Sequence, residues 1–424
     1  MQIHVVRRGE TLWTLSQRYR VSMNQIAAVN ELPDRNVLLV GQALVIPTPE
    51  GVYFVEPGDT LTAIARRYGT TAAQLAAINA ISDPSLISPG QALRVPARPR
   101  PTIETNGYLT DFGSRGQQFL RQVGPYLTYL SPFSYHVTAT GGLEPPGEDP
   151  VLSIARDERI APMMVITNWQ GRMFNSDLAH TVLNNTAVQD TLVQNILATL
   201  RAKRYIALNI DFEYIYPQDR EPYNRFVERM STVLHQNGYL LSTALAPKIS
   251  ATQTGRLYEA HDYPVHGRLC DFVVLMTYEW GWIGGRPWAI APMNEVERVL
   301  NYATSVIPRN KILMGVPVYA YDWTLPWREG TLAETFSPQE ALRRAVQHRV
   351  QIQYHPTYQA PYFHYTDNQG RRHEVWFEDA RSIQAKMDTV KRYGLRGVSY
   401  WELPTDFPQN WLVLADNFRV RKRV

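Results

Sequence analysis

The sequence predicts an α/β protein in which two small βααβ units precede an eight-stranded (β/α)8 barrel of the TIM type. Three observations lead to this prediction. One pattern occurs twice within the first hundred residues, apolar runs then alternate with helix-patterned segments, and one long gap interrupts that alternation. A chain of 424 residues is long enough to form several domains with sizeable cores.

Composition and charge exclude several classes of protein. Hydrophobic residues make up 44% of the chain and charged residues 19%, which is typical of a globular protein rather than a disordered one. The net charge is only +4, and no run of Lys and Arg forms the basic stripe of a nucleic-acid-binding protein. No apolar stretch approaches the roughly 18 residues of a membrane span, and Met1 leads directly into the strand-like IHVV without a secretory signal peptide. We therefore expect neither a nucleic-acid partner nor a membrane span.

Residues 1–49, the first repeat, and residues 50–97, the second repeat, are copies of one pattern. RRGETLWTLSQRYRVSMNQIAAVN, from Arg7, aligns with EPGDTLTAIARRYGTTAAQLAAIN, from Glu56, and the identities keep a constant offset of 49 positions. Such an offset indicates a duplication. Each copy predicts strand, helix, helix and strand, because a Thr that can cap a helix precedes residues with helical spacing.

The repeats resemble the LysM module, a βααβ unit that binds glycans containing N-acetylglucosamine. GDTL (GETL in the first repeat), the Asn after the second helix and the closing GQALVIP or GQALRVP carry this resemblance. It implies that the loops after the first strand and after the second helix contact the glycan. The implied contact residues are Gly9, Thr11, Leu12 and Asn30 in the first repeat and Gly58, Thr60, Leu61 and Asn79 in the second. A duplicated scaffold that binds nothing is the alternative.

The rest of the chain predicts the barrel. The proline-rich PARPRPTIE suggests a semi-rigid linker at 98–104, which leaves residues 105–424 for the barrel domain. Apolar runs that read as its strands lie at 106–111, 126–132, 161–169, 205–213, 240–247, 272–278, 312–319 and 397–401. Helical patterns between them include 191–203, 222–238, 294–304 and 379–394. Eight buried strands with intervening helices favour a (β/α)8 barrel.

The gap between the seventh and eighth strands predicts an α+β insertion at about 320–378. QIQYHPTYQAPYFHYTDNQGRRHEVWF has the alternation of β-hairpins, with a turn from Asp367 to Gly370. We expect this inserted lobe at the top edge of the barrel.

The fourth strand carries two carboxylates in an otherwise apolar run, YIALNIDFEY from Tyr205. Side chains alternate along a strand, so Asn209, Asp211 and Glu213 share one face, which points into the barrel. Glu213 then lies at the C-terminal mouth, where such barrels place their chemistry. Burial and a neighbouring like charge raise the pKa of one carboxyl, as a general acid requires. A hydrogen-bonded polar layer without chemistry is the alternative.

A metal site is disfavoured, because no His lies near these carboxylates and the sequence contains no HExxH or Cys/His spacing. We expect neither a metal nor another cofactor.

The barrel strands resemble those of family 18 glycoside hydrolases, the chitinase-like group. LNIDFEY is similar to that family's strand-four motif DGxDxDxE, MTYE (276–279) to its Met-x-Tyr-Asp, GVPVYAYDW (315–323) to strand seven, and GVSYWEL (397–403) to the Trp-bearing strand eight. The chain departs from the pattern at Ile206 and Asn209, which replace two Asp residues, and at Glu279, which replaces the strand-six Asp. ITNW replaces the Ser-x-Gly-Gly of strand three.

The resemblance implies retaining hydrolysis in which the substrate's own 2-acetamido group is the nucleophile. Glu213 is then the general acid and base, Asp211 orients the acetamido N–H, and the Tyr278 hydroxyl binds the acetamido carbonyl. Trp401 forms the floor beneath the −1 sugar. Further substrate contacts are expected from polar and aromatic residues at strand ends: Asn168, Trp169, Asn209, Lys248, Glu279, Trp280 and Tyr319, with Trp282 and Trp323 as additional aromatic candidates. His261 and His266 are expected in a surface loop instead.

The combination of LNIDFEY, ALAPK and MTYEW with two LysM-like repeats most resembles the bacterial spore cortical-fragment-lytic enzymes. It implies a peptidoglycan N-acetylglucosaminidase that works in the spore envelope, which agrees with the missing signal peptide. A chitinase or general N-acetylglucosaminidase is the first alternative. A non-catalytic glycan-binding protein is the second.

Overall fold

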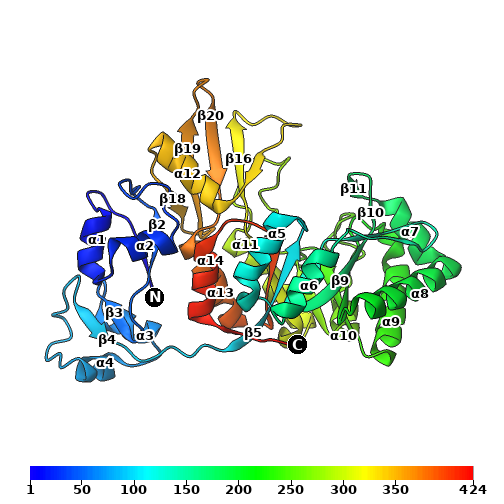
Figure 1. The fold of residues 1–424 in the computed structure, drawn as a ribbon, viewed down its shortest axis with the longest axis horizontal. Helices are drawn as coiled ribbons and strands as arrows, with labels where there is room; N and C mark the ends of the chain where they lie inside the picture. The colour runs from blue at the N-terminus through cyan, green and yellow to red at the C-terminus, as the bar shows by residue number, and fades with distance from the viewer. Residues whose placement is uncertain (424) are drawn as a thin grey trace.

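The computed structural model describes residues 1–423. Both repeats have the predicted order of strand, helix, helix and strand (Figure 1). In each repeat the two strands pair in antiparallel fashion, and the predicted Thr11 and Thr60 cap the first helix by accepting a hydrogen bond from a backbone N–H of its first turn. The elements are β1 (Gln2–Val5), α1 (Leu12–Tyr19), α2 (Met23–Val29) and β2 (Ala43–Ile46), then β3 (Val52–Phe54), α3 (Leu61–Arg67), α4 (Ala72–Ile78) and β4 (Ala92–Arg94).

Eight parallel strands form a closed barrel, which confirms the predicted fold class. Each neighbouring pair is hydrogen-bonded in parallel, and the pairing of β21 with β5 closes the cylinder. The strands are buried along nearly their whole length, because the barrel covers both of their faces. They are β5 (Thr102–Leu109), β6 (Tyr129–Pro132), β9 (Ala161–Thr167), β12 (Ala207–Asp211), β13 (Leu240–Leu245), β14 (Phe272–Leu275), β15 (Ile312–Pro317) and β21 (Gly397–Leu403).

The first barrel strand begins inside the segment that was predicted to be linker. β5 starts at Thr102 rather than after residue 104, because Thr102 and Ile103 pair with β22 (Arg419–Val420) at the end of the described chain. The segment between β4 and β5 is residues 95–101, which lies earlier in the chain than the predicted linker.

Helices surround the barrel. Four of them were predicted from their spacing and are present as α8, α9, α11 and α13. Phe212 packs between barrel and helix, with its ring 6.2 Å from that of Tyr223 and 6.0 Å from that of Phe226 on α9. The helices are α5 (Ser114–Val123), α6 (Asp149–Asp157), α7 (Ser176–Asn184), α8 (Thr186–Lys203), α9 (Arg220–Gln236), α10 (Tyr263–Leu269), α11 (Met293–Val306), α13 (Ala380–Tyr393) and α14 (Pro408–Asn417). Across residues 1–423, none of the helices combines the length and the apolar character of a membrane span.

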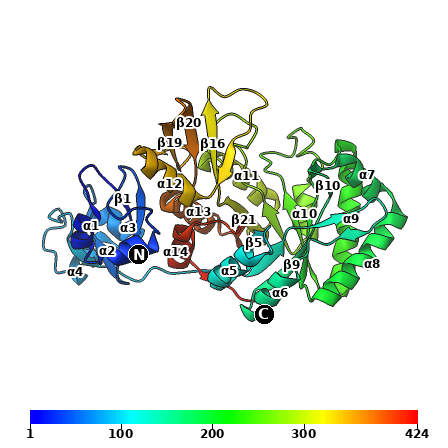
Figure 2. The same ribbon diagram turned by 45° about the horizontal axis from the view of Figure 1, so that its top comes forward.

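The inserted lobe is an antiparallel five-stranded sheet with one helix, as predicted. It stands above the barrel next to the first repeat (Figure 2). Asp367 forms the predicted turn by accepting hydrogen bonds from the N–H groups of Gln369 and Arg371, each at 2.9 Å. Its elements are β16 (Ala320–Leu325), β17 (Glu334–Phe336), α12 (Pro338–His348), β18 (Gln353–His355), β19 (Ala360–Thr366) and β20 (Arg372–Trp376).

Candidate active site

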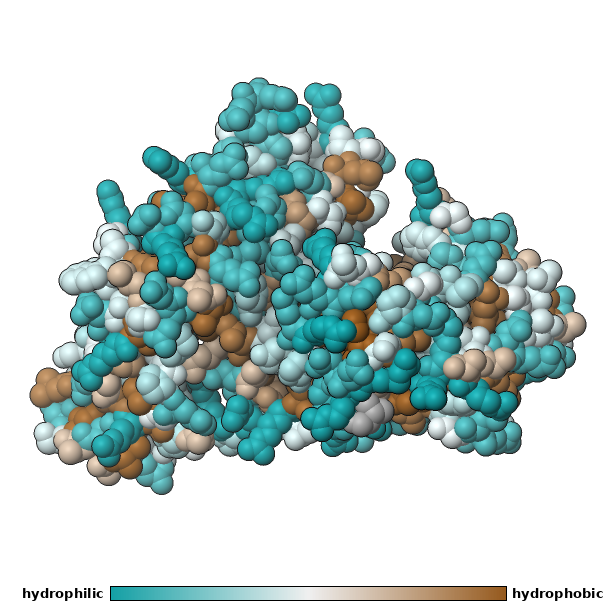
Figure 3. Space-filling view, in the orientation of Figure 1, coloured by the Kyte–Doolittle hydropathy of each residue, from teal (hydrophilic) through white to brown (hydrophobic). Residues whose placement is uncertain are grey.

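A cleft of about 550 Å³ lies at the C-terminal mouth of the barrel. In the space-filling view, this side of the molecule is hollowed between the inserted lobe and the hairpin of β10 (Trp169–Gln170) and β11 (Met173–Phe174) (Figure 3). The lining combines aromatic rings with carboxyl groups and contains no Lys or Arg. The carboxyl groups are those of Asp211, Glu213, Glu279 and Glu402, and the rings are those of Tyr108, Phe133, Trp169, Phe174, Tyr214, Tyr258, Tyr278, Trp282 and Trp401.

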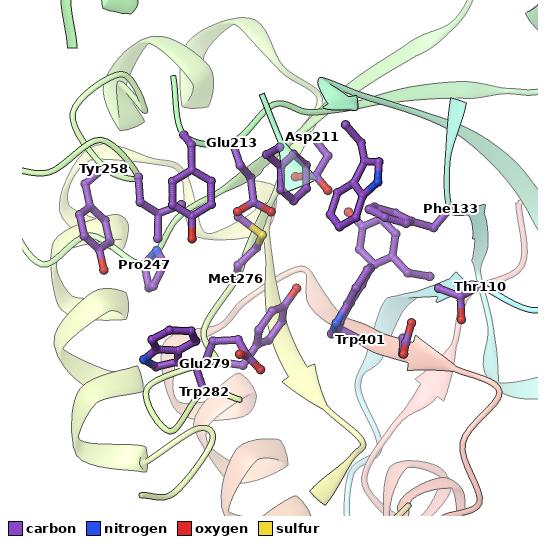
Figure 4. Close-up of a pocket in the computed structure, with 17 residues that line it drawn as sticks. Thr110, Phe133, Asp211, Glu213, Pro247, Tyr258, Met276, Glu279, Trp282 and Trp401 are labelled. Atoms are coloured by element: carbon purple, nitrogen blue, oxygen red, sulfur yellow. The ribbon is translucent and has the colours of Figure 1, made fainter. Parts of the chain in front are cut away.

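Strand β12 delivers the two carboxylates that the sequence singled out. Asp211 is the last residue of the strand and only 4% exposed, and Glu213 follows two positions later. Both side chains face the cleft (Figure 4), while Phe212 between them packs toward α9. The predicted alternation therefore holds through residue 213.

The backbone at Glu213 is held from two sides. The N–H of Glu213 donates to Oδ1 of Asn168 at 2.9 Å, and Nδ2 of Asn168 donates to the Glu213 carbonyl at 2.9 Å. On the other side, Nε2 of His261 donates to the Phe212 carbonyl at 3.0 Å. Tyr214, the next residue, adopts a left-handed conformation with φ of 54°. A non-glycine residue in this region costs free energy, which the surrounding contacts must offset.

Burial controls the protonation of the carboxyl pair. Asp211 Oδ1 is buried and has no hydrogen-bond partner among residues 1–423. Burial raises the pKa of Asp211. Burial, and then the charges of Asp211 and Glu279, raise the pKa of Glu213 well above its usual range. Because deprotonating one carboxyl makes it harder to deprotonate the other, the pair retains a proton where a lone carboxyl loses it. This arrangement suits a proton donor.

Tyr278 and Glu279 enter the cleft from the segment that follows β14. Oε1 of Glu279 accepts hydrogen bonds from the hydroxyls of Tyr319 and Tyr321, the latter at 2.9 Å. Burial nevertheless raises the pKa of Glu279. Gly315 on β15 leaves space for the Tyr278 ring, since a Cβ at this position would lie 2.7 Å from Tyr278 Cε1.

Trp401 on β21 supplies an aromatic wall of the cleft. Its ring lies 5.6 Å from that of Tyr108 and 4.8 Å from that of Phe133, both in edge-to-face geometry. Such contacts fix the orientation of the indole, and a fixed ring at this place can stack against a sugar.

Several predicted contact residues do not line the cleft. Asn209 lies one layer deeper, where it accepts from the Tyr108 hydroxyl at 3.0 Å and donates to Ser242 at 3.1 Å. Lys248 is 1% exposed and donates to the His261 carbonyl at 3.0 Å. Asn168 binds backbone groups with its amide, and the Tyr319 hydroxyl donates to Glu279. Trp280 packs against the barrel core, and Trp323 is buried in the lobe.

The prediction for the two histidines was wrong. His261 and His266 are 1% and 0% exposed, because the segment around α10 folds against the outside of the barrel instead of forming a surface loop. His261 Nδ1 accepts from the N–H of Ala246 at 2.8 Å. Burial lowers the pKa of His261 to about 4 and that of His266 to about 3, so both are neutral structural residues at neutral pH.

Sequence reasoning missed Glu402, which lines the cleft beside Trp401. Strict alternation sends neighbouring residues of a strand to opposite faces. The pairing of β21 with β5 shifts register between Tyr400 and Leu403. A bulge of this kind redirects side chains, which is why two consecutive residues reach the cleft. Tyr108 and Phe133 were missed as well, although Tyr108 lies in a predicted strand.

Within the repeats, the implied glycan contacts divide into exposed residues and residues whose side chains are used inside the repeat. Leu12 and Leu61 belong to the cores of their repeats. The side chain of Asn30 bonds both the N–H and the carbonyl of Val45 at 2.8 Å, and Asn79 bonds Arg94 in the same way. These four residues are structural. Gly9, Thr11, Gly58 and Thr60 are exposed.

Comparisons with known proteins agree with this geometry. The model of glycosyl hydrolases family 18 matches residues 151–406, and the model of the LysM domain matches residues 4–47 and 53–96. The chain is 51% identical to the cortical fragment-lytic enzyme of Bacillus subtilis (strain 168), over 100% of this chain and 99% of that protein. It is 44% identical to the enzyme of the same name from Bacillus anthracis, over the full length of both.

Comparison with a solved structure shows the same similarity. The crystal structure of the spore cortex-lytic enzyme SleL from Bacillus megaterium QM B1551 superposes with a TM-score of 0.90 at 40% identity, and covers 100% of this chain and 99% of that one. With a closed barrel, carboxylates at its mouth and matches of this extent, the chain belongs to glycosyl hydrolases family 18 and is a glycoside hydrolase with two LysM domains at its N-terminal end.

Proposed function

We propose that this enzyme cleaves the glycan strands of bacterial spore cortex peptidoglycan, that its LysM domains hold it on that polymer, and that it acts in the spore. The support is its similarity, along the whole chain, to proteins described as cortical fragment-lytic and spore cortex-lytic enzymes. Similarity over both LysM domains and the barrel covers the binding part and the catalytic part together. Fold alone does not indicate the polymer.

The proposed reaction is retaining hydrolysis assisted by the substrate. Glu213 gives its proton to the glycosidic oxygen while the acetamido oxygen of the −1 sugar bonds to the anomeric carbon, and the bond to the leaving sugar breaks. The Glu213 carboxylate then takes a proton from water, the water oxygen attacks the anomeric carbon, and the acetamido group is released unchanged. An intramolecular attack of this kind avoids up to roughly 7–11 kcal/mol of entropic cost. The raised pKa of Glu213 supports the first step.

An unsatisfied carboxylate oxygen in the cleft supports one proposed partner of the acetamido group. Asp211 Oδ1, which is buried and unpaired in the described chain, is the proposed acceptor for the acetamido N–H. The carboxylate also stabilises the positive charge that develops on the cyclic intermediate. The Tyr278 hydroxyl is the proposed donor to the acetamido oxygen, and Trp401 is the proposed floor beneath the ring.

The mechanism selects the sugar at the −1 position. A muramic δ-lactam ties its amide nitrogen into a ring and has no free N-acetyl group, so it is a poor internal nucleophile. We therefore propose N-acetylglucosamine at −1, which makes the enzyme an N-acetylglucosaminidase. Mass spectrometry of the new reducing ends in a cortex digest tests this, and muramic acid at those ends contradicts it.

The observation that carries the proposal is the placement of Glu213 in the cleft. Glu213→Gln removes the transferable proton and keeps the size of the side chain. We expect cleavage of cortex fragments to fall by roughly 10²–10⁴-fold, the usual contribution of a general acid, while sedimentation with insoluble peptidoglycan persists. Undiminished cleavage contradicts the proposal. Comparing rates on cortex fragments and on chitin oligomers separates it from a chitinase with the same mechanism.

A further inference from the structure

The first repeat is docked on the catalytic domain through hydrogen bonds to its helix-to-strand loop. Nε2 of Gln339, on α12 of the inserted lobe, donates to the carbonyls of Asn30, at 3.2 Å, and Glu31. Nε2 of Gln409, on α14, donates to Asn30 Oδ1 at 2.8 Å and to the carbonyl of Ala43 at 3.0 Å. The backbone carbonyls at the end of α2 are therefore already occupied by this chain.

Apolar packing seals the same interface. Leu39 of the first repeat is 6% exposed and belongs to the core of the inserted lobe, while Val45, 1% exposed, belongs to the core of the barrel domain. A cavity of only about 20 Å³ remains where Gln42 and Ala43 of the first repeat face the catalytic domain. At Gly41 a Cβ atom would lie 1.8 Å from the carbonyl oxygen of Ile352, so the two backbones are in direct contact. Packing this close resembles a protein interior rather than a loose domain contact.

The second repeat leaves the same face free. Leu39 corresponds to Ser88 and Val45 to Arg94, 49 positions later, and both of these polar residues are exposed. Ile78, the last residue of α4, and Leu86, within the helix-to-strand loop of the second repeat, are 49% and 73% exposed. The duplicated pattern has thus diverged at the residues that dock, toward apolar side chains in one copy and polar ones in the other.

We infer that the two LysM domains have divided their roles: the second repeat offers its helix-to-strand loop to the N-acetylglucosamine-containing glycan, and the first repeat is a rigid adaptor that fixes the second relative to the active site. This inference rests on the proposed function, because it takes the polymer from there. It adds which copy binds at this loop. Trp13, which is 60% exposed on α1 of the first repeat, is the strongest competing glycan contact.

Surface substitutions in the Glu213→Gln protein test the assignment without cleavage of the ligand. We expect Ile78→Asp with Leu86→Asp to weaken sedimentation with insoluble cortex peptidoglycan by about tenfold or more, a loss of roughly 1.4 kcal/mol, and Trp13→Ala to change it less than about twofold. A large loss of sedimentation in Trp13→Ala, with little change in the Ile78→Asp and Leu86→Asp variant, overturns the inference. The parent enzyme with Glu213 intact should hydrolyse small soluble cortex fragments. If the parent enzyme fails to cleave them, the proposed function is wrong, and the binding result still decides the roles of the repeats.

Two matched glycine variants test the docking itself. Gly41 and Gly90 occupy equivalent positions with φ of 83° and 85°, so replacement by Ala strains both backbones equally, but only Gly41→Ala also clashes with Ile352. In the Glu213→Gln protein, hydrogen exchange of residues 30–42 should be slow, and Gly41→Ala should accelerate it about tenfold or more while Gly90→Ala does not. In the Glu213→Gln parent, the N-acetylglucosamine pentamer should slow the hydrogen exchange of residues 78–88. It should slow the exchange of residues 30–40 only when Gly41→Ala is also present. Protection of residues 30–40 in the parent by this oligosaccharide overturns the inference.

Discussion

The side-chain amide of Asn168 bonds both backbone polar groups of Glu213, accepting from its N–H and donating to its carbonyl, each at 2.9 Å. Asn168 directly follows β9, the strand that pairs with β12. The backbone of the proposed proton donor is therefore held by a side chain at the end of the adjacent strand. Asn168 is 0% exposed and donates to the Asn175 carbonyl as well, so neither N–H group of its amide is free for a sugar.

Replacing Asn168 should slow catalysis without weakening substrate binding. In Asn168→Ala the backbone of Glu213 loses two hydrogen bonds and can shift, and a misplacement of about 1 Å can cost roughly 10²-fold in rate. We expect kcat on soluble cortex fragments to fall by about 10–10²-fold with KM changed less than about twofold. Asn417→Ala is the control, because Asn417 is also buried and makes two hydrogen bonds with its amide nitrogen, but on α14. A rise in KM with kcat unchanged contradicts a positioning role.

Asp211→Asn should stabilise the protein at alkaline pH while it lowers activity. Burial raises the pKa of Asp211 in the folded state, whereas in the unfolded chain it is about 3.9. The folded state then holds the proton more tightly, so its advantage is complete below the unfolded pKa and is lost as the pH rises through the folded pKa. Each pKa unit corresponds to about 1.4 kcal/mol of lost stability, which the amide avoids.

Urea unfolding at pH 4 and pH 8 measures this effect. The gain of Asp211→Asn over the parent should be small at pH 4 and larger at pH 8. Glu329→Gln, at an exposed position of the inserted lobe, is the control and should show no such difference. An equal gain at both pH values means that the titration of Asp211 is not the cause.

Much of the fold could be predicted from the sequence, because the hydrophobic pattern of the strands agrees with which of their residues are buried. Each of the eight barrel strands overlaps a segment that the sequence predicted as a strand, and nearly all of their residues are buried. The polar face of β12 points inward, as the two-residue period of a strand requires. The same rule fails at Glu402, where a register shift next to Tyr400 turns a second residue toward the cleft. Local pattern contains no signal for such a bulge.

Contacts between segments that are distant in sequence explain the other differences between the predicted and the observed roles of residues. Asn168 follows an apolar strand, exactly as a substrate contact would, and only the fold reveals that its partner is the backbone of Glu213. Asn30 and Asn79 are equivalent in sequence, yet only Asn30 is covered by Gln339 and Gln409, more than 300 positions away in the chain. His261, just before α10, and His266, on α10, are buried for the same reason.

Removing the Glu279 carboxyl should destabilise the barrel mouth. In Glu279→Ala the hydroxyls of Tyr319 and Tyr321, both largely buried, lose their common acceptor. An unsatisfied buried hydroxyl costs about 1–3 kcal/mol, so we expect the free energy of unfolding to fall by about 2 kcal/mol or more. Glu279→Gln keeps an acceptor oxygen and should lose much less. Equal losses in the two variants, measured by urea unfolding, contradict this explanation.

Tyr278→Phe should impair the formation of the cyclic intermediate. The proposed role of its hydroxyl is to hold the acetamido oxygen as that oxygen attacks, and loss of one donor to a reacting oxygen typically costs about 10²–10³ in kcat. Tyr258, which also lines the cleft, is the matched control, and Tyr258→Phe should keep kcat within about threefold.

The two variants and the parent enzyme are compared on aryl glycosides of N-acetylglucosamine and of its N-trifluoroacetyl analogue. Fluorine withdraws electrons from the amide oxygen, so a rate that depends on attack by this oxygen must fall steeply for the parent enzyme. If the analogue is cleaved as fast as the natural sugar, the nucleophile belongs to the enzyme and the substrate-assisted mechanism is wrong.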